Sequence, residues 1–347
     1  MHFASDNTGP THPKILDAVA KASEGYAMPY GNDQWAEKAK EKVRENFEAP
    51  DAAVFFAATG TAANSMILGA LTAPWATVFC HETAHILVDE SNGPEFYAGG
   101  AKLAPVAGGN GKMDPQALQA MLDRYAPGDI HTPARGPLSI TNVTEVGSTY
   151  SLAEIDALVA IAEAHGLPVH LDGARFANAC AALGCSAAEL SWKRGIDAVS
   201  FGGTKNGCMS VEAAIFFDPE KACDFERIRM RGGHLFSKHR ILSAQMAAYV
   251  TDGLWLELAQ KANAAAAQLA ESLGNHVEFL HRPDANMMFV KFPRALHRKL
   301  HANGAQFYSF ADENSGPDDE PITARLVCDW SASPENTERF VELLKAG

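Results

Sequence analysis

The alternation of short apolar strands with helices constrains the fold of this chain more than any other feature. From residue 13 to residue 252, runs that favour strands are separated by glycine-containing turns and by segments whose apolar residues recur at helical spacing. This order predicts an α/β fold with a mostly parallel central sheet and helices on both faces. The expected strands are 53–56, 77–80, 103–106, 138–142, 167–171, 196–201 and 213–217. One expected helix begins at Pro13, and the others cover 34–47, 62–71, 151–166 and 176–183.

The rest of the chain alternates differently and predicts a smaller α+β unit. We place the boundary near Thr251–Gly253, so that a large domain covers 13–252 and a small domain covers 253–347. Residues 1–12 are irregular and polar and are expected to reach the active site. The expected elements here are a long helical region from about 239 to 269, strands 287–292, 306–310 and 323–328, and helices 293–302 and 334–345.

Composition excludes several classes of partner. The formal net charge is −13 and no basic stripe is present, so nucleic acid and anionic membrane are not expected partners. We see no signal peptide and no apolar run near the roughly 18 residues that span a bilayer. The six cysteines are scattered through apolar segments without a C-x-x-C pair, which favours reduced thiols and a cytoplasmic protein.

A single lysine follows the strand at 196–201, in a segment from Ser200 to Gly207 that reads SFGGTKNG. Lys205 in such a turn can form an imine with a carbonyl group, although a plain surface lysine is the alternative. A second segment, which reads HLDGAR, places Asp172 and Arg175 just beyond the end of the strand before it. Pyridoxal phosphate needs this pair, since a lysine holds its aldehyde and a carboxylate holds its pyridinium nitrogen.

The turn Thr59-Gly60-Thr61 joins the strand at 53–56 to the following helix. A strand, a glycine turn and a helix leave free N–H groups at a helix start, where they can hold a phosphate. Many α/β connections contain Gly-Thr, so this motif is weak by itself. Ligands of parallel sheets lie outside the carboxyl ends of the strands, and this turn, Asp172 and Lys205 can converge there.

Residues 81–85 read HETAH and match the H-E-x-x-H pattern of zinc peptidases. That pattern needs both histidines on one helix face. The residues before and after it favour strands instead, so we expect no metal site. A histidine at a strand end that stacks on a planar cofactor is our interpretation of His85, and a buried, hydrogen-bonded histidine is the alternative.

Seven motifs in order resemble the low-specificity L-threonine aldolases, which are fold-type I pyridoxal phosphate enzymes related to β-eliminating lyases. The resemblance extends over nearly the whole chain, and its DGAR and GTKN segments are specific together. It implies retro-aldol cleavage of L-threonine, L-allo-threonine and related β-hydroxy-α-amino acids such as phenylserine, giving glycine and an aldehyde. The motifs are SDN from Ser5, YG from Tyr30, GTAAN from Gly60, AH at His85, HLDGAR, GTKNG and RLV from Arg325.

The resemblance also implies the roles of individual residues. Lys205 holds the cofactor as a Schiff base, Asp172 pairs with the pyridinium nitrogen, and His85 stacks on the ring. Arg175 lies near the cofactor's phenolic oxygen. The phosphate is bound by Gly60, Thr61 and Thr204. The substrate is bound by Ser5, Arg325, Arg175 and Tyr30. The family implies a homotetramer, a dimer of dimers with sites at the dimer interface.

Glu145 marks a departure from the family, because many members carry a histidine in the loop that here reads TEVG. We align Glu145 with that histidine as a catalytic residue, either as a base at the substrate's β-hydroxyl or as a residue that orients water, with a plain polar loop residue as the alternative. The residue through which the partner subunit contacts the phosphate also stays open. Its candidates are Lys238, Arg227, Arg229 and Arg231, and the alternative is that these four form an exposed basic run on a helix.

Three other functions remain open on the sequence alone. The same scaffold can support β-elimination or another amino-acid lyase reaction. The products separate the two reactions, because the aldolase forms glycine and an aldehyde whereas β-elimination forms pyruvate and ammonia. A zinc hydrolase is the second alternative. A non-enzymatic pyridoxal phosphate-binding domain for sensing or assembly is the third, although the chain is acidic and carries no DNA-binding segment.

Overall fold

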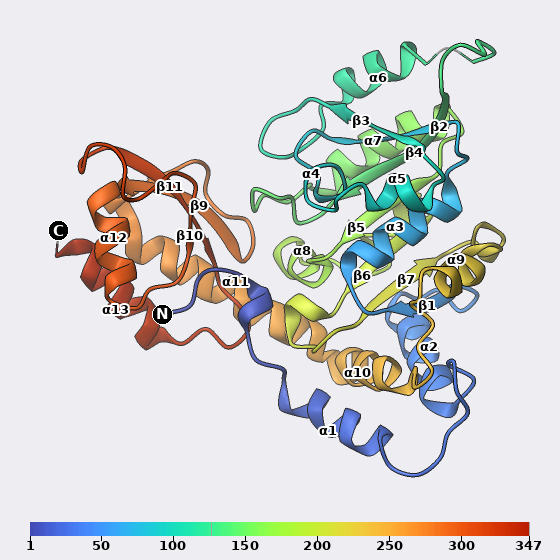
Figure 1. The fold of residues 1–347 in the computed structure, drawn as a ribbon, viewed down its shortest axis with the longest axis horizontal. Coiled ribbons are helices and arrows are strands. Elements are labelled where there is room, and N and C mark those ends of the chain that lie inside the picture. Colours follow the sequence, from blue (N-terminus) through green and yellow to red (C-terminus); the bar gives the residue numbers. More distant parts are fainter. Residues whose placement is uncertain (126, 347) are drawn as a thin grey trace.

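A seven-stranded sheet forms the centre of the computed structural model, which describes residues 1–125 and 127–346 (Figure 1). Its strand order is β1-β7-β6-β5-β4-β2-β3, and β7 runs antiparallel to both of its neighbours while the other pairs are parallel. The predicted mostly parallel sheet is therefore confirmed. The strands are β1 Ala53–Ala57, β2 Ala76–His81, β3 Lys102–Val106, β4 Ala134–Thr141, β5 Val169–Gly173, β6 Ala198–Gly202 and β7 Glu212–Phe216.

Helices cover both faces of this sheet, which buries the nearly continuous apolar runs of its strands. The helices α3 Gly60–Leu71, α4 His85–Val88, α5 Gly93–Tyr97 and α9 Phe225–Arg231 lie on one face. The other face packs against α2 Gln34–Asn46, α6 Pro115–Asp123, α7 Leu152–Ala164, α8 Phe176–Leu183 and α10 Arg240–Val250, with α1 Pro13–Ala22 beside α10. No helix of the described residues is long and apolar enough to cross a membrane.

Caps fix the helix starts that matter for the site. The hydroxyl of Thr59 accepts a hydrogen bond from the N–H of Ala62 at 3.2 Å, so α3 begins immediately after β1. In α7, Ser151 and Glu154 form both hydrogen bonds of the expected capping box. Each cap satisfies N–H groups that the helix itself leaves without a partner.

The C-terminal part is an antiparallel sheet backed by helices, in the order β10-β11-β9-β8. Its elements are β8 Glu278–Phe279, β9 Met287–Pro293, α12 Arg294–Ala302, β10 Tyr308–Ser309, β11 Pro321–Val327 and α13 Pro334–Lys345. The long helix α11 Leu254–Leu273 joins both parts, because its first half packs in the larger core and its second half in the smaller one. The division after residue 252 stays a prediction.

The N-terminal segment connects the small sheet to the large one. Phe3 is buried in the smaller core against Phe340, and its N–H donates to the carbonyl of Gln306 at 2.8 Å. A few residues later, Asp6 is 4% exposed and pairs with Arg175 beyond β5. The chain start therefore lies against the carboxyl end of the central sheet.

Three local expectations were wrong. His85 does not end a strand: β2 stops at His81, and Ile86 and Leu87 pack as a helical turn against α3. The expected helical region from 239 to 269 breaks at Thr251–Gly253, where Asp252 has φ of 53° and Gly253 of 70°. The expected strand at 306–310 shortens to Tyr308–Ser309, since it pairs with β11 over two residues.

Buried His170 in β5 predicts a loss of stability in acid. Burial lowers its pKa from 6.5 to about 4. The unfolded chain therefore binds the proton first, and the free energy of unfolding falls as pH drops from 6.5 to 4, by about 3 kcal/mol from this group. Urea unfolding of wild type and His170→Gln at pH 7 and pH 4 measures the difference. The matched exposed variant His131→Gln should behave as wild type, and equal acid sensitivity of all three proteins would contradict the prediction.

Candidate active site

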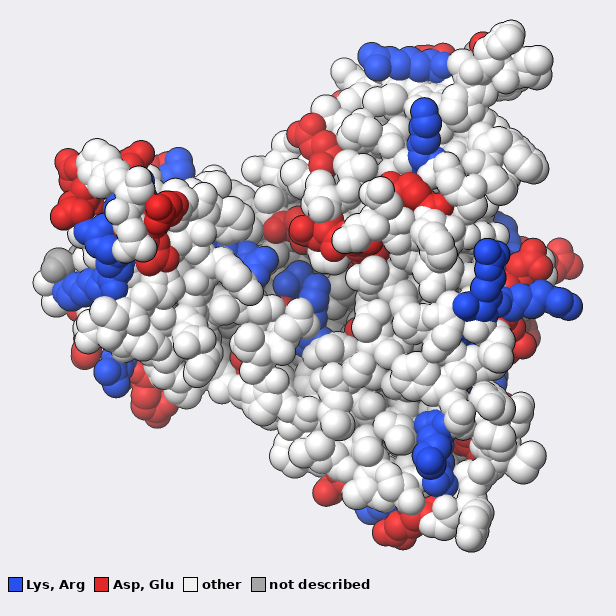
Figure 2. Space-filling model, viewed as in Figure 1, with Lys and Arg blue, Asp and Glu red and all other residues white. Residues whose placement is uncertain are grey.

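A cavity of about 280 Å³ lies where β1, β5 and β6 end, and it contains most of the expected cofactor residues. The turn before α3, the start of α4, the end of β5 and the turn after β6 all contribute side chains. Figure 2 shows the molecule hollowed between its two parts, with basic side chains inside the hollow and acidic ones along its rim. The carboxyl edge of the sheet thus brings together Lys205, Asp172, His85, Gly60 and Thr61.

Lys205 lies in a short 3₁₀ turn, η3 Thr204–Asn206, directly after β6. The two glycines before it allow close backbone contact, because a Cβ on Gly202 would lie 2.4 Å from the carbonyl oxygen of Ala174. Beyond the lysine, the side chain of Asn206 donates to the hydroxyl of Tyr249 and to the carbonyl of Trp255, both at 2.7 Å. The turn is therefore held on both sides while the Lys205 amine faces the cavity.

Asp172 lies inside β5, one residue before its end at Gly173, rather than just beyond the strand as expected, and it is 1% exposed. Its Oδ1 accepts from the N–H of Ala174 and its Oδ2 from the amide of Asn64, each at 3.1 Å. Asn64 in turn accepts from the hydroxyl of Ser200 at 2.7 Å. These donors fix the orientation of the carboxyl group. Asn64 was part of a motif, but its contact with Asp172 was not foreseen.

His85 begins α4 and is oriented by Glu90. Its Nδ1 lies 2.8 Å from Glu90 Oε1, which also accepts from Asn64 at 3.0 Å. The hydrogen bond to Glu90 raises the pKa of His85 and outweighs the effect of burial. Glu90 was missed, because nothing in its sequence neighbourhood distinguishes it from a surface glutamate.

The start of α3 has the features of an anion site. No neighbouring atom lies within 4 Å of the place where a Cβ of Gly60 would be, so the backbone there is open to a ligand. The first N–H groups of the helix have no acceptor within it. Thr61 brings a hydroxyl group to the same cavity, whereas the hydroxyl groups of Thr204 and Ser210 there are bonded to Glu212 and to the carbonyl of Ala58. The open N–H groups and the hydroxyl of Thr61 suit a phosphate group.

Glu212 is a second residue that the sequence did not reveal. It is 5% exposed, lines the cavity, and its Oε2 accepts from the N–H of Gly203 at 3.0 Å. Burial raises its pKa to about 7. Ligand-binding residues of a parallel sheet follow its strands, whereas β7 is antiparallel and brings its first residue to this edge.

Arg175 is buried and bound to Asp6, with its Nε 2.7 Å from Oδ2 and its Nη2 3.1 Å from Oδ1. Burial acts to raise the pKa of Asp6, but the guanidinium outweighs it and the pKa is lowered. Glu145 faces the charges of Arg175 and Lys205, yet burial raises its pKa. Both residues therefore lie in the electrostatic environment of the cavity.

The expected substrate residues lie in different places. Arg325 on β11 donates from Nη2 to the carbonyl of Ala4 at 3.1 Å, and its Nε is buried without a partner. Ser5 caps the short turn Asp6–Thr8. Tyr30 is 46% exposed on the segment before α2 and does not line the cavity. The structure thus brings Arg325 and Ser5 together near Asp6, and leaves Tyr30 apart.

The HETAH segment lacks the geometry of a zinc peptidase. His81 ends strand β2, whereas His85 begins helix α4, so the two rings do not share a helix face. His81 Nδ1 lies 2.9 Å from the hydroxyl of Thr83, and His85 is bound to Glu90. Each histidine has its own partner.

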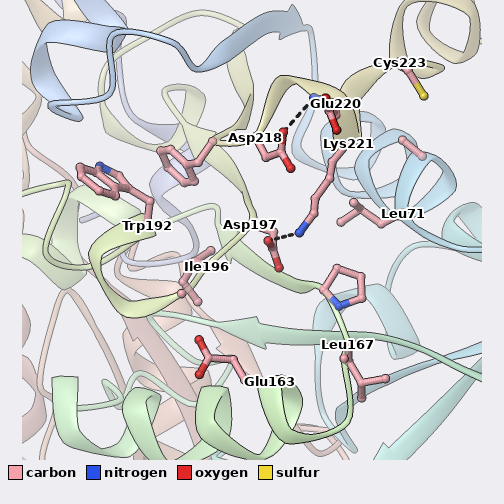
Figure 3. Close-up of a pocket in the computed structure, with 15 residues that line it drawn as sticks. Leu71, Glu163, Leu167, Trp192, Ile196, Asp197, Asp218, Glu220, Lys221 and Cys223 are labelled. Carbon is pink, nitrogen blue, oxygen red and sulfur yellow. Dashed lines mark hydrogen bonds and ion pairs between the residues drawn. The ribbon is translucent and has the colours of Figure 1, made fainter.

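A larger cavity of about 770 Å³ lies at the opposite edge of the sheet (Figure 3). It opens beside Leu167 and Ile196, which precede β5 and β6, and beside Asp218 after β7. Lys221 pairs there with Asp197, whose other carboxylate oxygen accepts from the N–H of Val169 at 2.7 Å. Size alone would select this cavity, but its lysine is already neutralised by an ion pair.

Comparison with known proteins gives consistent results. Residues 2–294 match the family model described as Beta-eliminating lyase. The low specificity L-threonine aldolase of Pseudomonas aeruginosa is 40% identical over 98% of this chain and 96% of its own length. A Leishmania major threonine aldolase structure has a TM-score of 0.92 at 28% identity, over 99% of this chain and 98% of that one.

A serine palmitoyltransferase structure from S. paucimobilis, with bound PLP, shares the fold alone. Its TM-score is 0.72 at 17% identity, and the match covers 100% of this chain and 86% of that one. The fold class expected from the sequence is therefore confirmed by structures as well as by the strand order.

The Asp6–Arg175 pair predicts a large cost for removing one charge. Asp6→Asn leaves Arg175 buried without its counter-ion, which should lower the free energy of unfolding by about 3–5 kcal/mol. Urea unfolding at pH 7 measures this loss. The exposed pair Glu37–Lys40 supplies the control, because Glu37→Gln should cost at most about 1 kcal/mol. Similar small costs for both variants would show that Arg175 does not depend on Asp6.

Proposed function

The chain belongs to the low-specificity L-threonine aldolases of the beta-eliminating lyase family, and from this we propose that it cleaves β-hydroxy-α-amino acids to glycine and an aldehyde. Its substrates are L-threonine, L-allo-threonine and related compounds such as phenylserine, and its cofactor is pyridoxal 5′-phosphate. The observation that supports this best is that Lys205 and Asp172 line one cavity beside the start of α3.

The residues of this cavity fit pyridoxal phosphate. Lys205 would hold its aldehyde carbon covalently, and Asp172 would bind the protonated ring nitrogen with a carboxylate that is already oriented. Gly60, Thr61 and Thr204 would hold the phosphate at the start of α3, and His85 would lie against the ring. When bound, the cofactor supplies an acceptor for the electrons of the broken Cα–Cβ bond.

The substrate's carboxylate is assigned to Arg325. Its buried Nε lacks a partner, so the guanidinium retains a donor for a carboxylate, and the planar group favours bidentate binding. Its Nη2 contact with Ala4 places Ser5 next to this donor. Arg175 would act near the cofactor's oxygen, where the pair with Asp6 keeps it oriented. These contacts fix the direction of the Cα–Cβ bond.

Glu145 and His85 are the two candidates for the base at the β-hydroxyl group. Burial raises the pKa of Glu145 and the bond to Glu90 raises that of His85, so both shift toward neutral pH. A base is most effective when its pKa lies near the working pH. We assign the role of base to Glu145, because the ring of His85, which Glu90 orients through Nδ1, is assigned to lie against the cofactor.

A second copy of the chain is part of this proposal. The segment between α1 and α2 exposes Tyr26 by 108%, Met28 by 66% and Tyr30 by 46%. Three large apolar side chains in one short loop are typical of an interface between proteins. We assign the loop to a dimer contact within a dimer of dimers, through which Tyr30 reaches the partner's substrate site. Lys238, Arg227 or Arg231 would reach the partner's phosphate site, whereas Arg229 is 6% exposed and paired with Glu226 in its own subunit.

Location and competing chemistry complete the proposal. All six cysteines are unpaired thiols, which suits the reducing cytoplasm. β-Elimination on the same scaffold is the competing reaction, and it would release pyruvate and ammonia rather than glycine and an aldehyde. Incubation of the purified protein with threonine and allo-threonine, followed by detection of all four products, decides between the two reactions.

Replacing the covalent lysine should remove the activity. Lys205→Ala cannot attach the cofactor, so glycine formation should fall to the rate measured without protein, and mass spectrometry after borohydride reduction should find no attached cofactor. Lys221→Ala, at the opposite edge of the sheet, is the matched control and should keep both. Wild-type cleavage of threonine by Lys205→Ala would refute the assignment.

Replacing Glu145 should separate binding from proton transfer. Glu145→Gln keeps the shape but cannot accept a proton, so kcat should fall about a hundred- to ten-thousandfold with cofactor content unchanged. The limb of the pH–rate profile that reports the base should also disappear. A retained limb in Glu145→Gln, together with its loss in His85→Asn, would move the role to His85.

A further inference from the structure

Glu212 lies between the two turns that form the cavity. In the sheet, Glu212 is opposite Ala57 of β1 and Gly202 of β6. Ala57 precedes the turn into α3 by two residues, and Gly202 precedes the Lys205 turn. One carboxyl group therefore borders both the proposed phosphate site and the turn that carries the lysine.

The hydrogen bonds of Glu212 hold the lysine turn. Its Oε2 accepts from the N–H of Gly203 at 3.0 Å, and the backbone and side chain of Thr204 also bond to it. The Thr204 hydroxyl in turn accepts from the N–H of Val211 at 3.1 Å. Because Thr204 and Glu212 line the same cavity as Gly60 and Thr61, a ligand anion there meets this carboxyl group.

Two negative charges in a buried cavity repel strongly, because little water screens them. An anion at the start of α3 therefore favours the neutral form of Glu212. We propose that Glu212 takes up a proton when an anion binds at the α3 start, and so couples phosphate binding to pH. The proposal rests on the phosphate site of the proposed function and adds a positioning residue to it.

The position of Glu212 makes this proton available near neutral pH, since burial raises its pKa to about 7. The positive charge of Lys205 on η3 lowers the pKa of Glu212 and so opposes the effect of burial. Asp172 on β5, Glu90 after α4 and Glu145 after β4 add negative charge around the cavity. His85 on α4 also gains a proton in acid and would strengthen anion binding with the same sign, so it needs its own control.

Sulfate is the appropriate probe for two reasons. It remains a dianion over the whole pH range of the experiment, and it forms no covalent bond with Lys205. Its Kd would be measured by calorimetry on the full-length chain freed of cofactor, at pH 6 and pH 8 and constant ionic strength. In His85→Asn, where Glu212 is the group that titrates with a pKa of about 7, the Kd should be about tenfold lower at pH 6 than at pH 8. Wild type should show at least this change, whereas the double variant with His85→Asn and Glu212→Gln should change less than about twofold.

Proton uptake gives a measurement that does not need the Glu212 variant to fold. At pH 7, His85→Asn should absorb about half a proton per bound sulfate. No uptake, or a tenfold pH effect retained in the double variant, would overturn the role of Glu212 and leave the aldolase assignment intact. Absence of sulfate binding in every protein at both pH values would instead remove the anion site on which both proposals rest.

Discussion

The carboxyl edge of the central sheet is the constraint on which the rest of the site depends. β1, β5 and β6 all end there, so the backbone brings the open start of α3, an acid and a lysine to one place. The antiparallel β7 lies between β1 and β6 and begins where they end. The edge therefore receives residues from strand ends and from one strand start.

Buried hydrogen bonds give this edge its rigidity. Asn64 on α3 contacts Asp172, Glu90 and Ser200, and so ties a helix, two strands and the turn after α4 together. Both amide atoms of Asn64 have partners in this network, which matters because an unpaired polar group costs free energy in the interior, whereas Oε2 of Glu90 is buried without a partner. The side chains that meet a ligand are thus oriented before it arrives.

Sequence reasoning could predict what depends on local pattern and on order along the chain. Periodicity, caps and glycine turns predict the strands, the capping box at Ser151, the lysine after β6 and the acid near the end of β5. Glu212 could not be found in this way, because its role comes from the direction of β7, which local pattern does not encode. The helical turn at His85 was missed since packing against α3 overrides the β-propensity of the apolar residues after it.

The charges around the cavity explain why the burial of its carboxyl groups affects how they bind protons. Asp172, Glu90, Glu145 and Glu212 provide more carboxyl groups than Lys205 and His85 can neutralise, and Arg175 is already paired with Asp6. A cofactor phosphate and a substrate carboxylate add further negative charge. A neutral carboxyl group lessens the repulsion of such ligands, and burial favours one here by raising the pKa of Glu212 to about 7. The same burial that disfavours charge in an empty cavity therefore prepares it for anionic ligands.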